Sequence, residues 1–146
     1  MPIKQTDPKG AHEILITDAS AIYLDVRTEG EFANGHPAGA INVPAFFMKA
    51  PGQMEPNADF AAVVDKVVAK NRPLIVGCMA GGRSQRACEI LEQSGFSDLT
   101  NVRGGFGGAR DPNGTVIVQG WRDLGLPVST DLGDASYLAL RKKAEL

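Results

Sequence analysis

The apolar positions in the first half of the chain alternate between helical stripes and short continuous runs. Apolar residues recur at helical spacing over 8–17, directly after Asp7, a residue type that often caps helices. Short apolar runs rich in strand-forming residues occupy 21–26 and 40–44, and a proline ends the second run. The pattern predicts one helix and two buried strands.

Two further helices and a loop are predicted before residue 72. Thr28 and Glu31 have the spacing of a capping box, which indicates that a helix begins directly after the first strand. The segment 50–57 contains two prolines and a glycine, so we expect a loop there. The clearest helix is expected over 59–71, where one apolar stripe consists of Phe60, Val63, Val64, Val67 and Val68.

The second half of the chain continues the alternation of strand and helix. An apolar run at 73–77 predicts a third strand, and 83–94 carries a helical stripe with Gly95 placed to end it. A fourth short strand is expected at 99–102. Strands separated by helices indicate an α/β domain with a mainly parallel sheet. In such sheets the ligand site lies beyond the carboxyl ends of the strands.

Glycines and turn residues dominate the last third of the chain. Six glycines fall within 104–120, and the apolar residues at 115–118 are expected to form the returning arm of a small hairpin. A final helix is predicted over about 135–143, capped by Asp134. No internal repeat or low-complexity segment interrupts this order.

Length and composition fit one globular domain. We expect a single domain over residues 1–146, with a core over about 8–128 and the C-terminal helix over about 134–144. The net charge of −2 gives no reason to expect nucleic-acid binding, which is typical of strongly basic domains. No stretch approaches the roughly 20 apolar residues that span a bilayer, so we expect no membrane insertion.

The cysteines and histidines indicate neither a disulfide framework nor a metal site. Two cysteines stand ten residues apart, one of them inside a predicted helix, and the two histidines lack metal-ligand spacing. We therefore expect no metal and no organic cofactor. The first residues also lack the apolar core of a signal peptide. These features favour a reducing compartment, the cytoplasm.

Cys78 stands where the third strand ends and the next helix begins. The first N–H groups of a helix favour negative charge, so a thiol at this place is shifted toward the nucleophilic thiolate. Gly81 and Gly82 can adopt positive φ and turn successive N–H groups inward as an anion-binding nest. Arg83 adds a permanent positive charge, and Ser84 adds a helix cap or a hydroxyl group. The alternative is a structural cysteine that closes a strand before an ordinary turn.

Three groups of residues resemble the rhodanese family in the same order along the chain. The first signature covers 23–32 and 35–44, the active-site loop covers 78–84, and the closing segment covers 102–105, Trp121 and 125–128. The resemblance extends from about residue 8 to 128. It implies a rhodanese-like three-layer α/β/α domain around the parallel sheet.

The resemblance implies a sulfurtransferase that works through a persulfide on Cys78. The thiolate would take a sulfane sulfur from a small donor such as thiosulfate, and a thiophilic acceptor, cyanide or a thiol, would then remove it. Backbone N–H groups and side chains of the loop would bind substrate and stabilise the persulfide anion without a general base. The substrate-binding residues expected on this basis are Met79, Ala80, Gly81, Gly82, Arg83 and Ser84.

Four polar residues beside the short strands are expected to brace the site rather than to act as acids or bases. We expect Arg27 to pair with Glu31 across one helical turn and Asp25 to accept backbone N–H bonds. His36 is expected to bond within its own loop. Cys88 is expected to be a small core residue rather than a resolving cysteine.

Three other functions remain as alternatives. A sulfur-relay module would use Cys78 to receive sulfur and pass it to a partner protein. Cysteine-dependent phosphatases and arsenate reductases are less favoured, because phosphatases place five residues between cysteine and arginine and usually a histidine before the cysteine. Here four residues intervene before Arg83, and Gly77 precedes Cys78. A noncatalytic scaffold is disfavoured by Cys78, which inactive members of the family often lack.

The chain departs from the family pattern at two places. Thiosulfate-active members often carry arginine directly after the cysteine, where this chain has Met79, so thiosulfate could be a poor donor. Gly105 and Trp121 are 16 positions apart, whereas the family commonly needs only a few. We expect the segment 106–120 to border the Cys78 pocket and shape access for the acceptor or a partner, with a tolerated surface insertion as the alternative.

Overall fold

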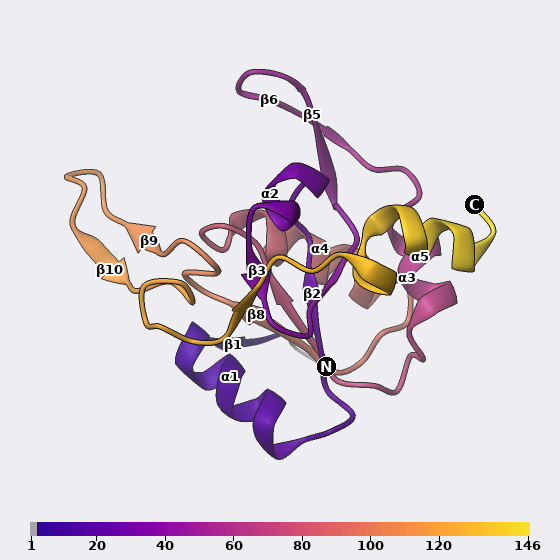
Figure 1. The fold of residues 1–146 in the computed structure, drawn as a ribbon, viewed down its shortest axis with the longest axis horizontal. Coiled ribbons are helices and arrows are strands. Elements are labelled where there is room, and N and C mark those ends of the chain that lie inside the picture. The colour runs from indigo at the N-terminus through magenta and orange to yellow at the C-terminus, as the bar shows by residue number, and fades with distance from the viewer. Residues whose placement is uncertain (1–2) are drawn as a thin grey trace.

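Five parallel strands form the central sheet of the computed structural model, which describes residues 3–146 (Figure 1). Each interior pair is in register without a bulge, as in the pairing of Ile22–Asp25 with Leu74–Gly77. The order across the sheet is β1 (Lys4–Thr6), β8 (Leu99–Val102), β7 (Leu74–Gly77), β2 (Ile22–Asp25) and β4 (Ile41–Asn42). All the strands therefore end at one edge, where a site is expected.

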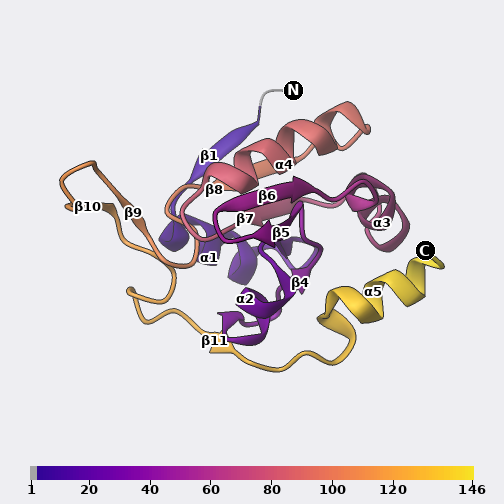
Figure 2. The same cartoon turned by 90° about the horizontal axis from the view of Figure 1, so that it is seen from above.

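Helices cover both faces of the sheet, which gives three layers (Figure 2). One face is covered by α1 (Pro8–Thr17) and α2 (Glu29–Ala33). The other is covered by α3 (Phe60–Val67), α4 (Gly82–Gln93) and α5 (Tyr137–Ala144). The α/β architecture with a mainly parallel central sheet is confirmed.

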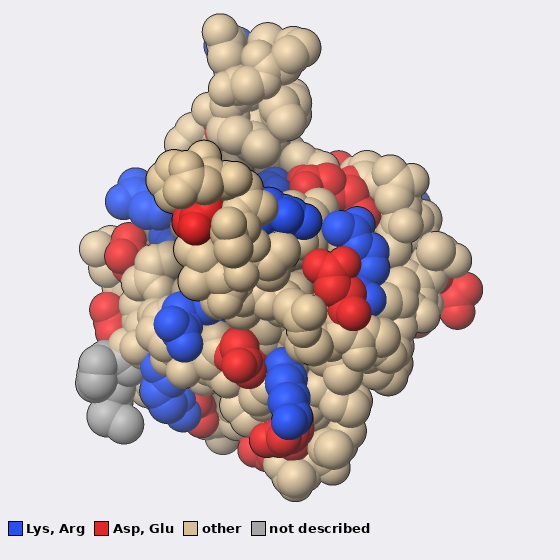
Figure 3. Space-filling model, turned by 90° about the vertical axis from the view of Figure 1, so that its left-hand side faces the viewer, with Lys and Arg blue, Asp and Glu red and all other residues tan. Residues whose placement is uncertain are grey.

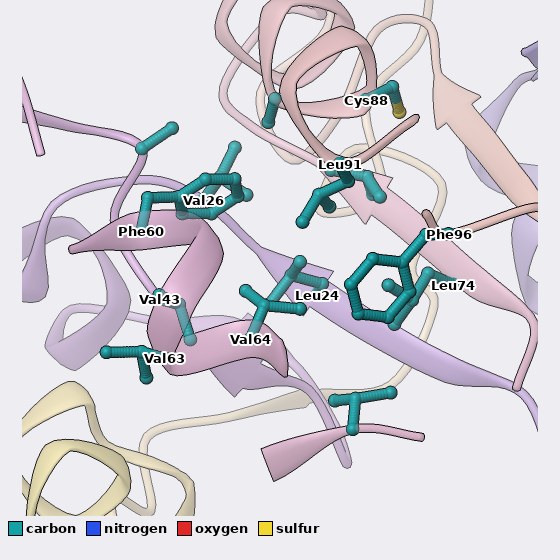
Figure 4. Packing of buried hydrophobic residues seen from close by; sticks show 14 of the residues in the cluster. Leu24, Val26, Val43, Phe60, Val63, Val64, Leu74, Cys88, Leu91 and Phe96 are labelled. Atoms are coloured by element: carbon teal, nitrogen blue, oxygen red, sulfur yellow. The ribbon is translucent and has the colours of Figure 1, made fainter. Parts of the chain in front are cut away.

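Alternation along the central strands divides the buried side chains between two cores. Successive residues of a strand point to opposite faces, so Leu24 and Leu74 enter one core while Tyr23 and Ile75 enter the other. Figure 4 shows the first core, where side chains of the sheet meet apolar faces of α3 and α4. Cys88 is fully buried there, as expected for a small apolar residue.

Several local signals in the sequence are confirmed by the helix ends. Asp7 Oδ1 accepts the Gly10 N–H at 2.8 Å and caps α1. Thr28 and Glu31 form both bonds of the capping box that begins α2. Gly95 follows α4 with φ of +99°, a conformation that favours glycine.

Two expected helix boundaries are wrong. The helix predicted over 59–71 ends at Val67, because Val68 turns extended and buries its branched side chain in the core. The last helix is capped by Ser136, which accepts the Ala139 N–H at 3.2 Å. Asp134, the expected cap, lies instead in the 3-10 turn Gly133–Ala135.

The segment 50–57, expected as a loop, belongs to a hairpin of β5 (Phe46–Ala50) and β6 (Gln53–Pro56). Gly52 adopts φ of +76° at the tip, so the proline and glycine make a tight turn rather than an irregular loop. Every residue of β6 is exposed, which removes the alternation that marks a strand in sequence.

A second hairpin consists of β9 (Ala109–Arg110) and β10 (Val116–Val118), which confirms the returning arm predicted at 115–118. Both hairpins project from the body of the molecule (Figure 1). Seen from the side of β9–β10, the surface carries interspersed positive and negative groups (Figure 3). A short pair of β3 (His36–Pro37) with β11 (Val128–Ser129) joins the C-terminal segment to the first half. Within residues 3–146, no helix has the length and apolar character needed to cross a bilayer.

Candidate active site at the end of the third sheet strand

The Cys78 thiol lies between the end of β7 and the start of α4. Its sulfur accepts the Gly81 N–H at 3.0 Å, and Gly81 has φ of +124° at the position that caps the helix. The Ser84 hydroxyl oxygen lies 3.4 Å from the sulfur within the first turn of α4. Cys78 as a whole residue is only 2% exposed. The sulfur thus occupies the positive end of a 12-residue helix, in surroundings that favour an anion.

The glycine-rich segment 104–107 fixes the outer side of this loop. Its N–H groups donate to three successive loop carbonyls, from Gly104 to Ala80 at 3.0 Å, from Phe106 to Cys78 at 2.8 Å and from Gly107 to Met79 at 2.9 Å. Because these carbonyls point outward to the segment, the Gly81 N–H is free to turn inward to the sulfur.

Gly105 sits where a side chain cannot be accommodated. A Cβ at this position would overlap the Cys78 carbonyl oxygen, and the backbone has φ of +47°. We expect Gly105→Ala to lower the free energy of unfolding by about 3 kcal/mol, since both the left-handed strain and the displaced loop contribute. Urea denaturation gives this value.

Gly125→Ala is the matched control for the strain alone. Gly125 has φ of +70°, but no heavy atom lies within 4 Å of its Cβ position. We expect this variant to lose only about 1–2 kcal/mol, the cost of a left-handed alanine. Equal losses in the two variants would show that the Gly105 contact with the loop contributes nothing.

Arg83 forms an ion pair with Glu31. The guanidinium donates to both carboxylate oxygens, at 2.7 and 3.0 Å, and so ties the start of α4 to α2. Partial burial opposes ionisation of Glu31, but bonds from Arg83 and the Thr28 N–H outweigh it and lower the pKa to about 2. The expected pairing of Arg27 with Glu31 is therefore wrong, since Glu31 finds its cation 52 positions away.

We expect Glu31→Gln to lower the free energy of unfolding at pH 7 by about 1–2 kcal/mol. The folded pKa of about 2 lies below the ordinary value of 4.5, so the carboxylate stabilises the fold above pH 4.5. This stabilisation is lost as the pH falls toward 2. Urea denaturation across that range should show the difference between the two proteins shrinking as the pH falls, and a constant difference would contradict the assignment.

Arg27 and Asp25 form a buried pair beside the loop, with side-chain exposures of 2% and 1%. Arg27 Nη2 donates to Asp25 at 2.7 Å and to the Gly35 carbonyl at 2.7 Å, and the guanidinium lies over the Phe106 ring. Asp25 also accepts the Arg27 backbone N–H at 3.0 Å, as expected. The expected bond of His36 within its own loop is wrong, because its ring nitrogen bonds to the Phe32 carbonyl of α2 at 2.7 Å and so braces that helix.

A hollow of about 220 Å³ opens beside the loop. Met79 and Phe106 form part of its wall, and the Arg122 guanidinium lies 5.5 Å from the Phe106 ring. The other lining residues are Arg27, Glu31, Asn34 and Gly35. Of the segment 106–120, only Phe106 lines this hollow, while the β9–β10 hairpin projects away from the body (Figure 1). The segment therefore borders the site through its first two residues, Phe106 at the hollow and Gly107 at the Met79 carbonyl.

The structure brings together all seven loop residues predicted from the sequence and joins Glu31 to them through Arg83. Ala80 and Gly82 are exposed on the rim, Met79 is half-buried, and Ser84 is fully buried. Cys88 takes no part in this site, and burial raises the pKa of its thiol to about 12. Nowhere in residues 3–146 do three His, Cys, Asp or Glu side chains cluster as metal ligands.

Sequence reasoning missed Asn101, whose Oδ1 accepts the Ser84 hydroxyl proton at 2.5 Å. It lies in β8 and is 3% exposed. It also missed Asn42 in β4, which donates to the carbonyls of Asp25 and Arg27 at 3.0 and 2.9 Å. An amide inside a short apolar strand was the available signal, because a buried polar group needs a partner.

The chain is similar in sequence to a known family and to proteins within it. A family model described as Rhodanese-like domain matches residues 8–110. Thiosulfate sulfurtransferase 16, chloroplastic, of Arabidopsis thaliana is 43% identical over 96 residues, 66% of this chain and 78% of that protein. Thiosulfate sulfurtransferase GlpE of Haemophilus influenzae is 31% identical over 131 residues, 89% of this chain and 98% of that protein. Two longer plant relatives are matched over about half of their length.

The fold is also similar to that of a solved structure. The crystal structure of Rv0390 from M. tuberculosis is 28% identical, with a TM-score of 0.75. The similarity covers 90% of this chain and all of that one.

Proposed function

Because the chain belongs to the rhodanese-like domain family, we propose that it is a sulfurtransferase in which Cys78 carries sulfur as a persulfide. One observation carries the proposal: the Cys78 sulfur accepts the Gly81 N–H at the start of α4. An anionic sulfur is stabilised there by backbone dipoles, without a general base. Relatives named thiosulfate sulfurtransferase support the same chemistry.

The first step loads the sulfur. The Cys78 thiolate attacks the outer sulfur of a donor such as thiosulfate, a new S–S bond forms, and the bond to the sulfonate sulfur breaks. Sulfite leaves with the electron pair of that bond. The product is a persulfide anion whose charge lies mainly on the outer sulfur, while the Gly81 N–H donates to the inner one, the Cys78 sulfur.

The second step returns the enzyme to its starting state. A nucleophile such as cyanide or a thiolate attacks the outer sulfur of the persulfide, forms a bond to it and displaces the Cys78 thiolate. Thiocyanate or a new persulfide is released. The hollow bounded by Met79 and Phe106 is the proposed approach for the acceptor. A relay protein as acceptor and a cytoplasmic location stay predictions.

Three features of the site favour sulfur transfer over phosphate chemistry. Four residues separate Cys78 from Arg83, and the Arg83 guanidinium is already paired with Glu31 rather than free to bind a phosphate. The space beside Gly77 that a side chain would fill is taken by the Tyr23 hydroxyl. A histidine before the cysteine, as in phosphatases, would have to displace the buried Tyr23 side chain.

The proposal is tested by incubating the protein with thiosulfate, removing free donor and measuring the intact mass. We expect a gain of one sulfur atom that is released again by cyanide as thiocyanate. No gain from thiosulfate or from any other sulfane donor would overturn the proposal. Hydrolysis of an aryl phosphate that depends on Cys78 would replace it with the phosphatase alternative.

A further inference from the structure

A line of hydrogen-bonded polar side chains begins at Cys78 and runs through the interior toward the surface. The Cys78 thiol donates to Ser84 Oγ at 3.4 Å, and the Ser84 hydroxyl donates to Asn101 Oδ1 at 2.5 Å. Both partners are almost completely buried, at 0% and 3% exposed. The inner part of the line therefore has no bulk water to substitute for a lost bond.

The outer part of the line consists of three amides and one carboxylate. Asn101 Nδ2 donates to Gln5 Oε1 at 2.9 Å, and Gln5 Nε2 donates to Gln85 Oε1 at 2.7 Å. Gln85 Nε2 in turn lies 3.4 Å from Glu89 Oε2. Every donor thus points outward, from the thiol to a surface carboxylate, and this order suits a protonated sulfur.

Ser84 cannot serve an anionic sulfur while this order holds. Its hydroxyl has one proton, and Asn101 Oδ1 at 2.5 Å and the Gly81 carbonyl at 3.1 Å both compete for it. A thiolate or persulfide has no proton to donate and gains from every donor that reaches it. Among residues 3–146 the Gly81 N–H donates to the Cys78 sulfur, and the Ser84 hydroxyl, 3.4 Å from the sulfur, is the next group with a proton to offer.

We propose that Asn101 is a positioning residue whose amide reverses when the Cys78 sulfur becomes an anion. In the reversed state Nδ2 donates to Ser84 Oγ, and the Ser84 proton turns to the sulfur. An amide keeps its shape when its oxygen and nitrogen exchange places, so the reversal fits a packed interior. The amide of Gln5 is exposed and that of Gln85 half-buried, so both can follow with the help of water. The inference deepens the proposed function by naming what prepares Ser84 for the thiolate and persulfide.

Other charged and titratable groups surround the loop, and the variants below leave them in place. They come from β2, the turn after it, α2 and α4: Tyr23, Asp25, Arg27, Glu31, Arg83, Cys88 and Glu89. Four of them are paired within two salt bridges, Asp25 with Arg27 and Glu31 with Arg83. A change in sulfur reactivity in the variants therefore does not come from the loss of one of these groups.

The test uses Asn101→Asp, which has the same shape but can only accept the Ser84 proton. We expect alkylation of Cys78 by iodoacetamide at neutral pH to slow by about tenfold or more, and its pH profile to move to higher pH. Peptide mass spectrometry assigns the alkylation to Cys78 rather than to the buried Cys88. An unchanged rate and profile would overturn the inference.

A second background separates positioning from the added charge. Ser84→Ala removes the intermediary, so Asn101→Asp introduced into it should slow alkylation much less than in the native chain. Equal slowing in both backgrounds would identify a through-space charge effect and overturn the inference.

If Asn101→Asp does not fold, Gln5→Glu at an exposed position takes its place. A carboxylate there holds Asn101 in its outward orientation, and we expect about threefold slower alkylation that again requires Ser84. Gln53→Glu on the β6 strand is the control with the same charge change and should leave the rate unchanged. Equal rates for Gln5→Glu and the native chain would count against the inference. Alkylation needs no sulfur donor, so failure of thiosulfate loading alone would overturn the proposed function and not the role of Asn101.

Discussion

Cys78→Ser is expected to abolish sulfur loading while leaving the fold intact. A serine hydroxyl cannot form a persulfide, and it is a far weaker acid than a thiol, so it supplies almost no nucleophilic anion. We expect thiosulfate-dependent mass gain to disappear and thiocyanate formation to fall by at least about 10³-fold, as for other lost nucleophiles. The smaller oxygen can still accept the Gly81 N–H, so the free energy of unfolding should change by no more than about 1 kcal/mol.

Cys88→Ala is the matched control for this experiment. Cys88 lies completely buried on the core face of α4, and burial raises the pKa of its thiol to about 12, so it is not a nucleophile at neutral pH. The variant should lose some stability through the small cavity and still load one sulfur atom. If loading persisted in Cys78→Ser and disappeared in Cys88→Ala, Cys88 would be the sulfur carrier and the proposed mechanism would be wrong.

The parts of the fold that could be predicted are those written in local signals. The cap at Asp7, the capping box of Thr28 with Glu31 and the glycine after α4 each act within a few residues, so the sequence alone contains them. The β5–β6 hairpin was missed because its second strand is exposed throughout. A strand without a buried face has no alternation to recognise.

The loop could be predicted as a unit because its residues are consecutive, but its partners could not. Glu31 was assigned to the nearby Arg27, whereas the fold brings it to Arg83 and leaves Arg27 to Asp25. Which carboxylate meets which guanidinium depends on how α2 lies against α4, and the spacing along one helix says nothing of that. The same limit hid Asn101, which reaches Ser84 only once β8 lies beside β7.

The two ion pairs support the site in different ways. The Arg83–Glu31 pair is partly open to water, with side-chain exposures of 19% and 27%. It fixes the start of α4, and its loss should lower the free energy of unfolding only modestly because water screens the two charges. The Arg27–Asp25 pair is almost completely buried, and the Arg27 guanidinium also packs against the Phe106 ring. The backbone N–H of Phe106 in turn donates to the Cys78 carbonyl. The buried pair should therefore affect stability far more than the partly exposed one.

Arg27→Met is expected to lower the free energy of unfolding by about 3–5 kcal/mol, because it leaves the buried Asp25 carboxylate without its cation. Domains of this size are stable by only about 5–15 kcal/mol, so the loss should show as a large shift of the urea midpoint. Methionine keeps much of the apolar stem, so the effect reports charge rather than lost volume. Sulfur loading should fall with it, since Phe106 loses the guanidinium beneath its ring.

The double variant Asp25→Asn, Arg27→Met distinguishes an uncompensated charge from a packing defect. Removing both charges leaves no buried ion, so the pair should recover part of the stability lost by Arg27→Met alone. Arg86→Met on the exposed face of α4, where the side chain is 70% exposed, should change stability by less than about 0.5 kcal/mol. If the double variant were less stable than Arg27→Met, the Asp25 carboxylate would stabilise the fold through its bond from the backbone N–H of residue 27. Its burial without the Arg27 guanidinium would then not be the cause of the lost stability.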